Sequence, residues 1–230
     1  MMILQHKVRA PGGRRSLRVS LVSFCLWVFL LSLPAAAGII DRIAVTVDNQ
    51  AITLSQVLEE IRVTAFLNGE QPDFSAASKR KTAERMVEQA LIRHEMEFNR
   101  YQMPTLADTD SMLKQVKDAY SSDQAYQDAL RRDGITEAQV RQHLLWQVTT
   151  LRFIDYRFRP GIQIVEQDME DYYNAHRQEL ERGGKLPPLD QVRGQIEDLL
   201  KQQRIDQALD RWLGEARTQA QISYKPEAFL

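Results

Sequence analysis

The chain has 230 residues, a single cysteine and a nearly balanced charge, with 30 Lys and Arg against 31 Asp and Glu. This balance argues against a protein that binds nucleic acid, because phosphate binding needs a face rich in Lys and Arg. One cysteine excludes a disulfide framework within the chain and a zinc site built on several cysteines. Packing alone is therefore expected to stabilise the fold.

The first 37 residues have the pattern of a cleaved secretory signal. A stretch with five Lys and Arg precedes the apolar run Val19–Leu33, and the small residues Ala35-Ala36-Ala37 follow it. We therefore expect export, with cleavage after Ala37. An uncleaved membrane anchor is the alternative, although the apolar run is shorter than the roughly 20 residues that a spanning helix needs.

Removal of this segment would leave 193 residues, enough for one moderately large core or for a core with an appended lobe. The segment contains five basic residues and no acid, so the remainder has a net charge of −6. Cys25 lies within it, so the remainder has no thiol. These properties favour a soluble protein of the cell envelope.

The first expected elements are short strands. Ile39–Val47 alternates apolar and polar residues, Asp48-Asn49 supplies a turn, and Ala51–Thr53 forms a second strand or an extended return. The edge of so small a sheet needs a partner. Gln221–Tyr224, near the other end of the sequence, is the candidate.

Helices are expected from Thr53 to Leu180, with starts marked by capping residues and ends marked by glycine or proline. Their ranges are Thr53–Asn68, Ser75–Tyr101, Thr105–Tyr120, Ala125–Leu130, Thr136–Phe158 and Glu166–Leu180. The expected buried residues of the second are Ala83, Met86, Val87, Ala90, Leu91, His94 and Phe98. The fifth carries two apolar stripes, so it must pack on two sides or present aromatic side chains to a groove.

Leu189–Thr218 is predicted to form one long amphipathic helix that closes the fold. Its apolar residues recur at three- and four-residue steps. They are Val192, Ile196, Leu199, Leu200, Ile205, Leu209, Trp212, Leu213 and Ala216. Because a lone helix with this stripe is not stable in water, we expect it to bury Ile196, Leu199, Leu209 and Trp212 against the preceding lobe. Ile222 should then reach the edge of the strand at Ile43–Val47.

These patterns predict a mainly α fold class, with a small β element that pairs an N-terminal with a C-terminal strand. Residues 38–180 are expected to form a helical lobe. The Gly- and Pro-rich segment 181–188 is a junction loop, and residues 189–230 supply the helix and strand that complete the same lobe.

The sequence nominates no catalytic residue and no metal ligand. His94, His143 and His176 lie on different expected helices, and none has a second ligand at a zinc-binding interval. Asp108-Thr109-Asp110 and the acidic turn Glu166–Asp171 are typical of helix N-termini. Nucleotide-binding loops and nucleophile elbows do not occur in the sequence. We therefore expect no cofactor and no small-molecule substrate.

Aromatic and methionine residues are the more unusual feature, because they suit a groove that accepts varied apolar segments. The set is Met112, Tyr120, Tyr126, Trp146, Phe153, Tyr156, Tyr172 and Tyr173. Each of them, taken singly, could instead belong to the core. Our predicted substrate-binding residues are Trp146, Phe153, Tyr156, Tyr172 and Tyr173.

Three stretches in order resemble one known family, the SurA-type periplasmic chaperones. Asp41–Val57 is similar to the opening strand, turn and first helix of that family. Asp133-Gly134 with the long helix after it also matches, and Val192–Leu213 is similar to the closing helix. The resemblance covers nearly the whole chain after residue 37. Each stretch is mostly hydrophobic pattern, so their order is what gives the resemblance its weight.

The resemblance implies an ATP-independent periplasmic holdase for unfolded, aromatic-rich segments of exported proteins, such as outer-membrane protein precursors. Related proteins carry a parvulin prolyl isomerase domain, about a hundred residues long, ahead of the closing helix. Here only Glu181–Pro188 occupies that place, so we expect no isomerase domain and no enzyme activity. The alternatives are a prolyl isomerase with an unrecognised site and a membrane-anchored assembly protein. The oligomeric state stays open.

Overall fold

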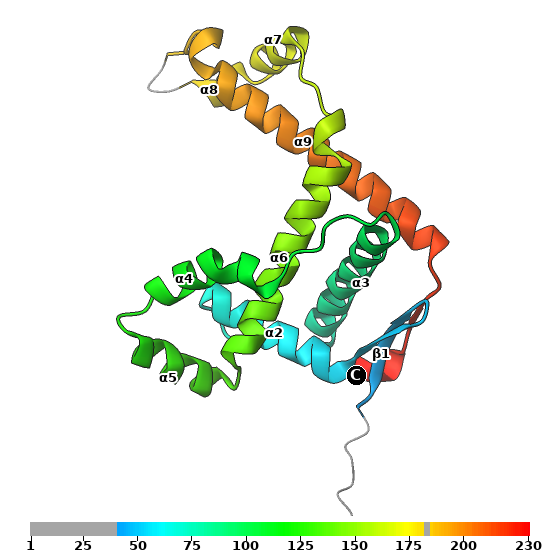
Figure 1. The fold of residues 1–230 in the computed structure, drawn as a ribbon. Coiled ribbons are helices and arrows are strands. Elements are labelled where there is room, and N and C mark those ends of the chain that lie inside the picture. The colour runs from blue at the N-terminus through cyan, green and yellow to red at the C-terminus, as the bar shows by residue number, and fades with distance from the viewer. Residues whose placement is uncertain (1–40, 182–184) are drawn as a thin grey trace, which may run out of the picture. The chain divides into compact units, whose positions relative to one another are not determined.

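A computed structural model describes residues 41–181 and 185–230 (Figure 1). The predicted secretory signal and its cleavage site lie outside these residues. The described chain is mainly helical and has one three-stranded antiparallel sheet. The predicted fold class, mainly α with a small β element, is confirmed.

The sheet joins strands from the two ends of the described chain, in the order β2-β1-β3. β1 (Ile43–Val47) and β2 (Gln50–Thr53) form a hairpin, and Asp48 in its turn has φ 49°, which suits the two-residue turns that Asp and Asn favour. β3 (Ile222–Tyr224) pairs with the other edge of β1, with Val47 opposite Ile222. The predicted pairing of Ile222 with this strand is confirmed.

Backbone and side-chain hydrogen bonds on both sides of β3 fasten the last part of the chain to β1 and to the residues that flank it. Lys225 N donates to Ala44 O at 2.9 Å, and Arg42 Nη1 donates to Glu227 O at 2.8 Å. On the other side of β3, Gln221 N donates to Asp48 Oδ1 at 2.7 Å. A short 3-10 turn, η3 (Pro226–Ala228), then leads to the buried Phe229.

The helices follow the predicted order. They are α2 (Leu54–Asn68), α3 (Ala76–Phe98), α4 (Asp110–Asp118), α5 (Asp123–Asp133), α6 (Glu137–Arg157), α7 (Glu166–Ala175), α8 (Arg177–Leu180) and α9 (Leu189–Gln219), with 3-10 turns η1 (Leu106–Thr109) and η2 (Arg159–Gly161). Capping boxes open α2 at Thr53 and α6 at Thr136, and left-handed glycines end α2 at Gly69 and α5 at Gly134. The single helix expected from Glu166 to Leu180 is wrong.

His176 separates α7 from α8 because its ring bonds to the last turn of α7. The backbone at His176 leaves helical geometry (φ −113°, ψ 27°), and its Nδ1 donates to Tyr172 O at 2.9 Å. The ring also stacks on Tyr172, with 3.9 Å between the centroids. Tyr172 O thus accepts from both the backbone N of His176, at 3.0 Å, and the ring of the same residue, and this local side-chain bond marks the end of α7.

The side of α3 that is buried changes along the helix. The prediction that His94 and Phe98 are buried is therefore wrong. Ala83, Val87 and Leu91 pack into the core between the sheet and α2, as predicted. Further along, Ile92 and Met96 are buried against α6 instead. His94 and Phe98 are exposed, Phe98 to 76%. The reason is that α3 meets the sheet and α2 first and then α6 and α9, so the inward direction rotates.

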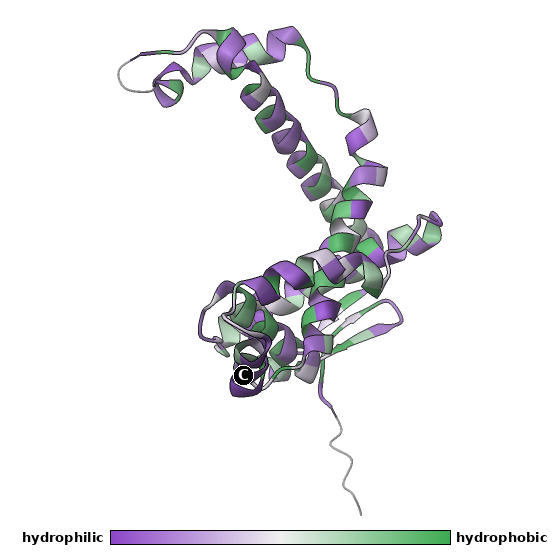
Figure 2. Ribbon diagram, turned by 60° about the vertical axis from the view of Figure 1, so that its left-hand side comes forward, coloured by the Kyte–Doolittle hydropathy of each residue, from purple (hydrophilic) through white to green (hydrophobic). Residues whose placement is uncertain are grey.

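α9 is one helix of 31 residues, as predicted, with hydrophilic and hydrophobic positions along its whole length (Figure 2). Its first half packs on α7, where Ile196 is buried beside Met169. Its second half contacts α3, and there Leu209 and Trp212 are half-buried. The prediction that Leu199 is buried is wrong, since this side chain is 39% exposed. The short α7 covers only one side of this part of α9, so the adjacent side stays open.

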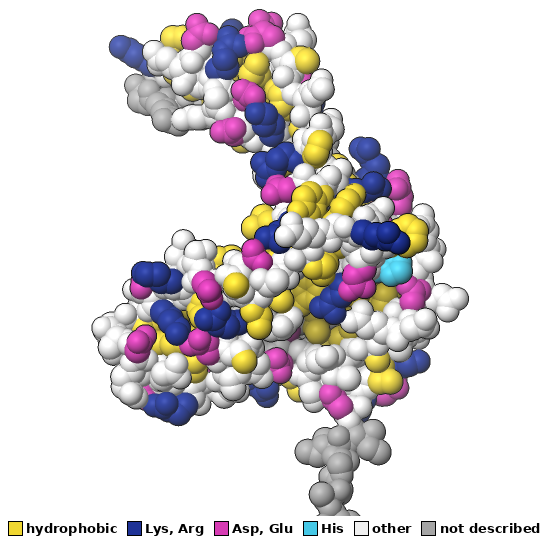
Figure 3. Space-filling view, in the orientation of Figure 1, with side chains coloured by type: hydrophobic (Ala, Val, Ile, Leu, Met, Phe, Trp, Pro, Cys, Tyr) yellow, Lys and Arg dark blue, Asp and Glu magenta, His cyan; other side chains and the backbone are white. Residues whose placement is uncertain are grey.

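Positive and negative side chains are intermixed over the face shown in Figure 3, and many form ion pairs. Arg217 Nη2 on α9 lies 2.7 Å from Glu88 Oε1 on α3. Lys117 Nζ on α4 lies 2.7 Å from Glu137 Oε2 on α6. Among the described helices we find none with the length and apolar character needed to cross a membrane.

We predict that Trp212→Ala lowers the free energy of unfolding by about 2–3 kcal/mol, somewhat less than for a fully buried tryptophan. Trp212 packs against two core clusters, and its ring centroid lies 4.7 Å from that of Phe153. Urea unfolding followed by circular dichroism measures the loss. Leu199→Ala on the same helix is the control and should change stability by less than about 1 kcal/mol, because Leu199 is exposed. Equal losses would contradict the observed packing.

The Lys117–Glu137 pair predicts a loss of stability in acid. Lys117 holds the pKa of the Glu137 carboxyl below its ordinary 4.5, although partial burial opposes the shift. The folded state therefore binds this proton less tightly than the unfolded state. The stabilisation is present above the unfolded-state pKa and is lost as the pH falls through the folded-state pKa.

The variant Glu137→Gln tests this effect. Its free energy of unfolding should fall less than that of the parent protein between about pH 6 and pH 3, in urea titrations at each pH. Glu170→Gln, at an exposed position of α7, should keep the parental pH dependence. A parental acid loss in Glu137→Gln would contradict the assignment.

Candidate functional site

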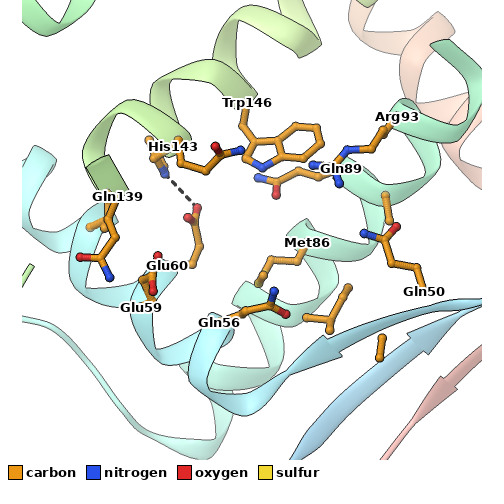
Figure 4. A pocket seen from close by; sticks show the side chains of 15 residues that line it. Gln50, Gln56, Glu59, Glu60, Met86, Gln89, Arg93, Gln139, His143 and Trp146 are labelled. Atoms are coloured by element: carbon orange, nitrogen blue, oxygen red, sulfur yellow. Dashed lines mark hydrogen bonds and ion pairs between the residues drawn. The ribbon is translucent and has the colours of Figure 1, made fainter. Parts of the chain in front are cut away.

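An open groove of about 320 Å³ lies beside β2, with walls formed by α2, α3 and α6 (Figure 4). Its lining residues are Gln50, Ala51 and Ile52 of β2, Gln56, Glu59, Glu60 and Val63 of α2, Met86, Gln89, Ala90 and Arg93 of α3, and Gln139, Gln142, His143 and Trp146 of α6. β2 is an edge strand, with β1 on one side only. The groove therefore lies beside one of the two edge strands of the sheet.

Trp146 and Met86 give the groove its largest apolar surfaces. Both are half-buried, so each keeps part of its side chain accessible. Arg93 Cζ lies 4.2 Å from the centroid of the Trp146 ring, a cation–π contact that fixes the orientation of the indole. Burial lowers the pKa of Arg93, although nearby Glu97 opposes the shift. The guanidinium is thus partly removed from water where it meets the ring.

Five of the residues that line the groove are glutamines. Gln56 and Gln139 accept hydrogen bonds from the N-cap nitrogens of their own helices, at 2.9 and 2.7 Å. The amides of Gln50, Gln89 and Gln142 make no hydrogen bond to a residue that the structure describes. An amide can both donate and accept, so these groups can pair with main-chain N–H and C=O of a ligand without reading its sequence.

His143 and Glu60 form a polar pair at one end of the groove. His143 Nδ1 lies 3.0 Å from Glu60 Oε1, and His143 Nε2 lies 3.1 Å from the Nε2 of Gln147. Each ring nitrogen of His143 therefore has a polar neighbour, and the imidazole is held against the carboxylate of Glu60.

A shallow apolar surface continues the groove along α6. Gln89, His143 and Trp146 line both depressions, and Thr150 and Leu151 extend the second one. Leu151 is 56% exposed. Trp146 thus lies where the two surfaces join, and a bound segment could run from β2 past the indole to Leu151.

Of the five predicted substrate-binding residues, only Trp146 lines this groove. Phe153 has no exposed surface and packs against Ile92, Met96 and Trp212. It is a core residue, and its assignment to a binding surface is corrected. The misassignment arose because Phe153 lies between α3 and α9, a contact that the helical pattern does not reveal.

The three predicted tyrosines lie elsewhere. Tyr156 is 41% exposed, and its ring centroid lies 5.3 Å from that of Tyr101. Tyr172 and Tyr173 belong to α7, where both pack near the start of α9, and Tyr173 Oη donates to Pro187 O at 2.7 Å. The five aromatics therefore do not form one surface. The groove instead combines Trp146 with polar residues of α3. The sequence pattern alone gives no reason to distinguish these residues from other solvent-exposed polar residues.

A second depression, of about 420 Å³, lies between α3 and α9. Its lining includes Leu91, Trp212 and the exposed Phe98, whose ring stacks near that of His94 with 6.3 Å between centroids. Arg157 Nε lies 3.8 Å from Glu95 Oε1 at its rim. None of the described residues that line it belongs to a strand, in contrast to the groove at β2.

Asp108, one of the acids singled out from the sequence, has a structural role at the start of η1. Asp108 Oδ2 accepts from Thr105 N at 2.7 Å, and Oδ1 accepts from Arg152 Nη2 at 2.8 Å, so both partners lower its pKa. The histidines His94, His143 and His176 are separated from one another. Within residues 41–181 and 185–230 there is no group of three or more His, Cys, Asp or Glu that could hold a metal ion.

Comparisons of the sequence with protein-family models and with curated proteins gave no match.

Proposed function

We propose that this protein is an ATP-independent holdase chaperone that binds unfolded segments of exported proteins in the periplasm, outer-membrane protein precursors among them. The observation that carries the proposal is the open groove at β2, in which half-buried Trp146 and Met86 adjoin free amide groups. The secretory pattern of residues 1–37 and the resemblance to SurA-type chaperones support the cellular setting.

The apolar surfaces suit clients of varied sequence. Methionine adapts its shape to different partners, and the indole of Trp146 offers a large flat contact to aromatic or aliphatic side chains. Leu151, exposed beyond the indole, extends the apolar contact along α6. Such contacts favour apolar segments without requiring one particular residue.

The polar surfaces suit an extended backbone. Ala51 is exposed on β2, and the strand has a neighbour on one side only. An extended segment could therefore form main-chain hydrogen bonds with this edge, as in other cases of strand addition. Gln50, Gln89 and Gln142 surround the same space.

Weak and reversible binding is sufficient for this function. A chaperone that binds the unfolded state lowers the concentration of free aggregating chains by mass action. Ordering a flexible client costs much of the contact free energy, so an open groove of this size is expected to release its clients readily.

We predict that the protein slows aggregation of a urea-unfolded outer-membrane barrel protein at equimolar ratio, and that Trp146→Ala needs about tenfold more protein for the same effect. Light scattering after dilution from urea measures both. Tyr172→Ala is the matched control, because Tyr172 is also a half-buried aromatic but lies on α7 outside the groove. Failure of the parent protein to slow aggregation, or equal loss in the two variants, would contradict the proposal.

A proline-limited refolding assay separates this function from that of an enzyme. We expect no acceleration of refolding at an enzyme-to-substrate ratio of about one to a hundred, because a holdase needs near-stoichiometric amounts. Clear catalysis at that ratio would instead support a prolyl isomerase.

A further inference from the structure

The charged residues of the groove are separated along its length. Glu59 and Glu60 of α2 lie at one end, Arg93 of α3 lies at the other, and the Trp146 ring lies between them (Figure 4). The two ends differ in how their charges are balanced, and this difference bears on which polypeptide segments the groove accepts.

The positive end is balanced within the protein. Arg93 is stacked on the Trp146 ring, and it also interacts electrostatically with Glu97, one helical turn further along α3. A client therefore gains little by placing an acid there, since the guanidinium already has two partners.

The negative end is not balanced. Glu59 is half-buried and has no ion-pair partner among the residues that the structure describes. The Glu60 side chain is only 14% exposed, and the one basic side chain within ion-pair distance of it is His143, at 3.0 Å. Arg93 is the one Lys or Arg among the described residues that line the groove. Two carboxylates thus share a partly enclosed space whose described lining has no Lys or Arg at that end.

A bound apolar segment would displace water from these carboxylates. Removing water from a carboxylate is unfavourable unless a hydrogen-bond donor or a positive charge replaces it. A concave surface that carries one sign of charge also strengthens the field that an incoming group experiences. The groove should therefore disfavour purely apolar and acidic segments, and favour segments that bring a cation.

Resting on the function proposed above, we infer that the groove selects extended client segments in which Lys or Arg lies within a few residues of an aromatic side chain. The aromatic side chain contacts Trp146 and Met86, and the cation pairs with Glu59 and Glu60. Charge complementarity thereby adds selectivity to a surface whose apolar contacts alone discriminate little.

Fluorescence anisotropy with labelled peptides tests the inference on the purified protein. Three peptides share one uncharged, tyrosine-containing sequence and differ at a single position, two residues from the tyrosine, occupied by Lys, Gln or Glu. The Lys peptide should bind at least about fivefold more tightly than the Gln peptide, and the Glu peptide more weakly still. The advantage of Lys should shrink in about 0.5 M NaCl, where exposed charges are screened.

Glu59→Gln identifies the residues responsible. This variant keeps the size of the side chain and removes one charge. The Lys peptide then loses an ion pair and the Gln peptide no longer removes water from this carboxylate, so the Lys advantage should fall to about twofold or less. Glu170→Gln, a charge-matched control at an exposed position of α7, should retain the full advantage.

Three results would overturn the inference. In the first, the Lys, Gln and Glu peptides bind equally well, and Trp146→Ala abolishes binding of all three. This result would exclude charge selectivity and leave the chaperone proposal intact. Equal effects of Glu59→Gln and Glu170→Gln would assign any preference to the overall charge. Absence of peptide binding, with normal suppression of aggregation, would place client contacts outside the groove.

Discussion

The pairing of β3 with β1 is the contact on which the rest of the structure depends. It makes β1 the central strand, holds the end of α9 beside the hairpin turn through Gln221 and Asp48, and brings Phe229 into the core. It also positions Trp212 against Phe153. Because β3 occupies one edge of β1 and β2 occupies the other, the outer edge of β2 is the one left beside the groove.

The groove follows from how α3 is shared among its neighbours. Where α3 contacts the sheet and α2, it buries Ala83 and Val87. Further along, where it contacts α6, it buries Ile92 and Met96. Between these contacts its polar positions Gln89 and Arg93 face the space beside Trp146. A helix that supports two core clusters thus leaves a partly polar recess between them, where an apolar contact and free hydrogen-bonding groups occur together.

The sequence predicts the elements well because their signals are local. Nearby residues predict the capping boxes at Thr53 and Thr136 and the left-handed glycines. The pairing of the two terminal strands is predicted because the edge of a small sheet needs a partner strand. The groove is harder to predict. Trp146 and Phe153 are seven residues apart and so lie on nearly the same face of α6. Phe153 is core because Trp212 covers it, whereas Trp146 meets Arg93, and only the tertiary packing of α9 decides between these outcomes.

We propose that unfolded clients bind in the groove between β2, α2, α3 and α6. Site-specific photo-crosslinking tests it most directly, with p-benzoylphenylalanine in place of Gln142 at the groove, or of Gln127 at an exposed position of α5. The label at position 142 should form a covalent adduct with an unfolded outer-membrane barrel protein, and the label at position 127 should form little. Equal adduct formation at both positions, or none at position 142, would contradict the account.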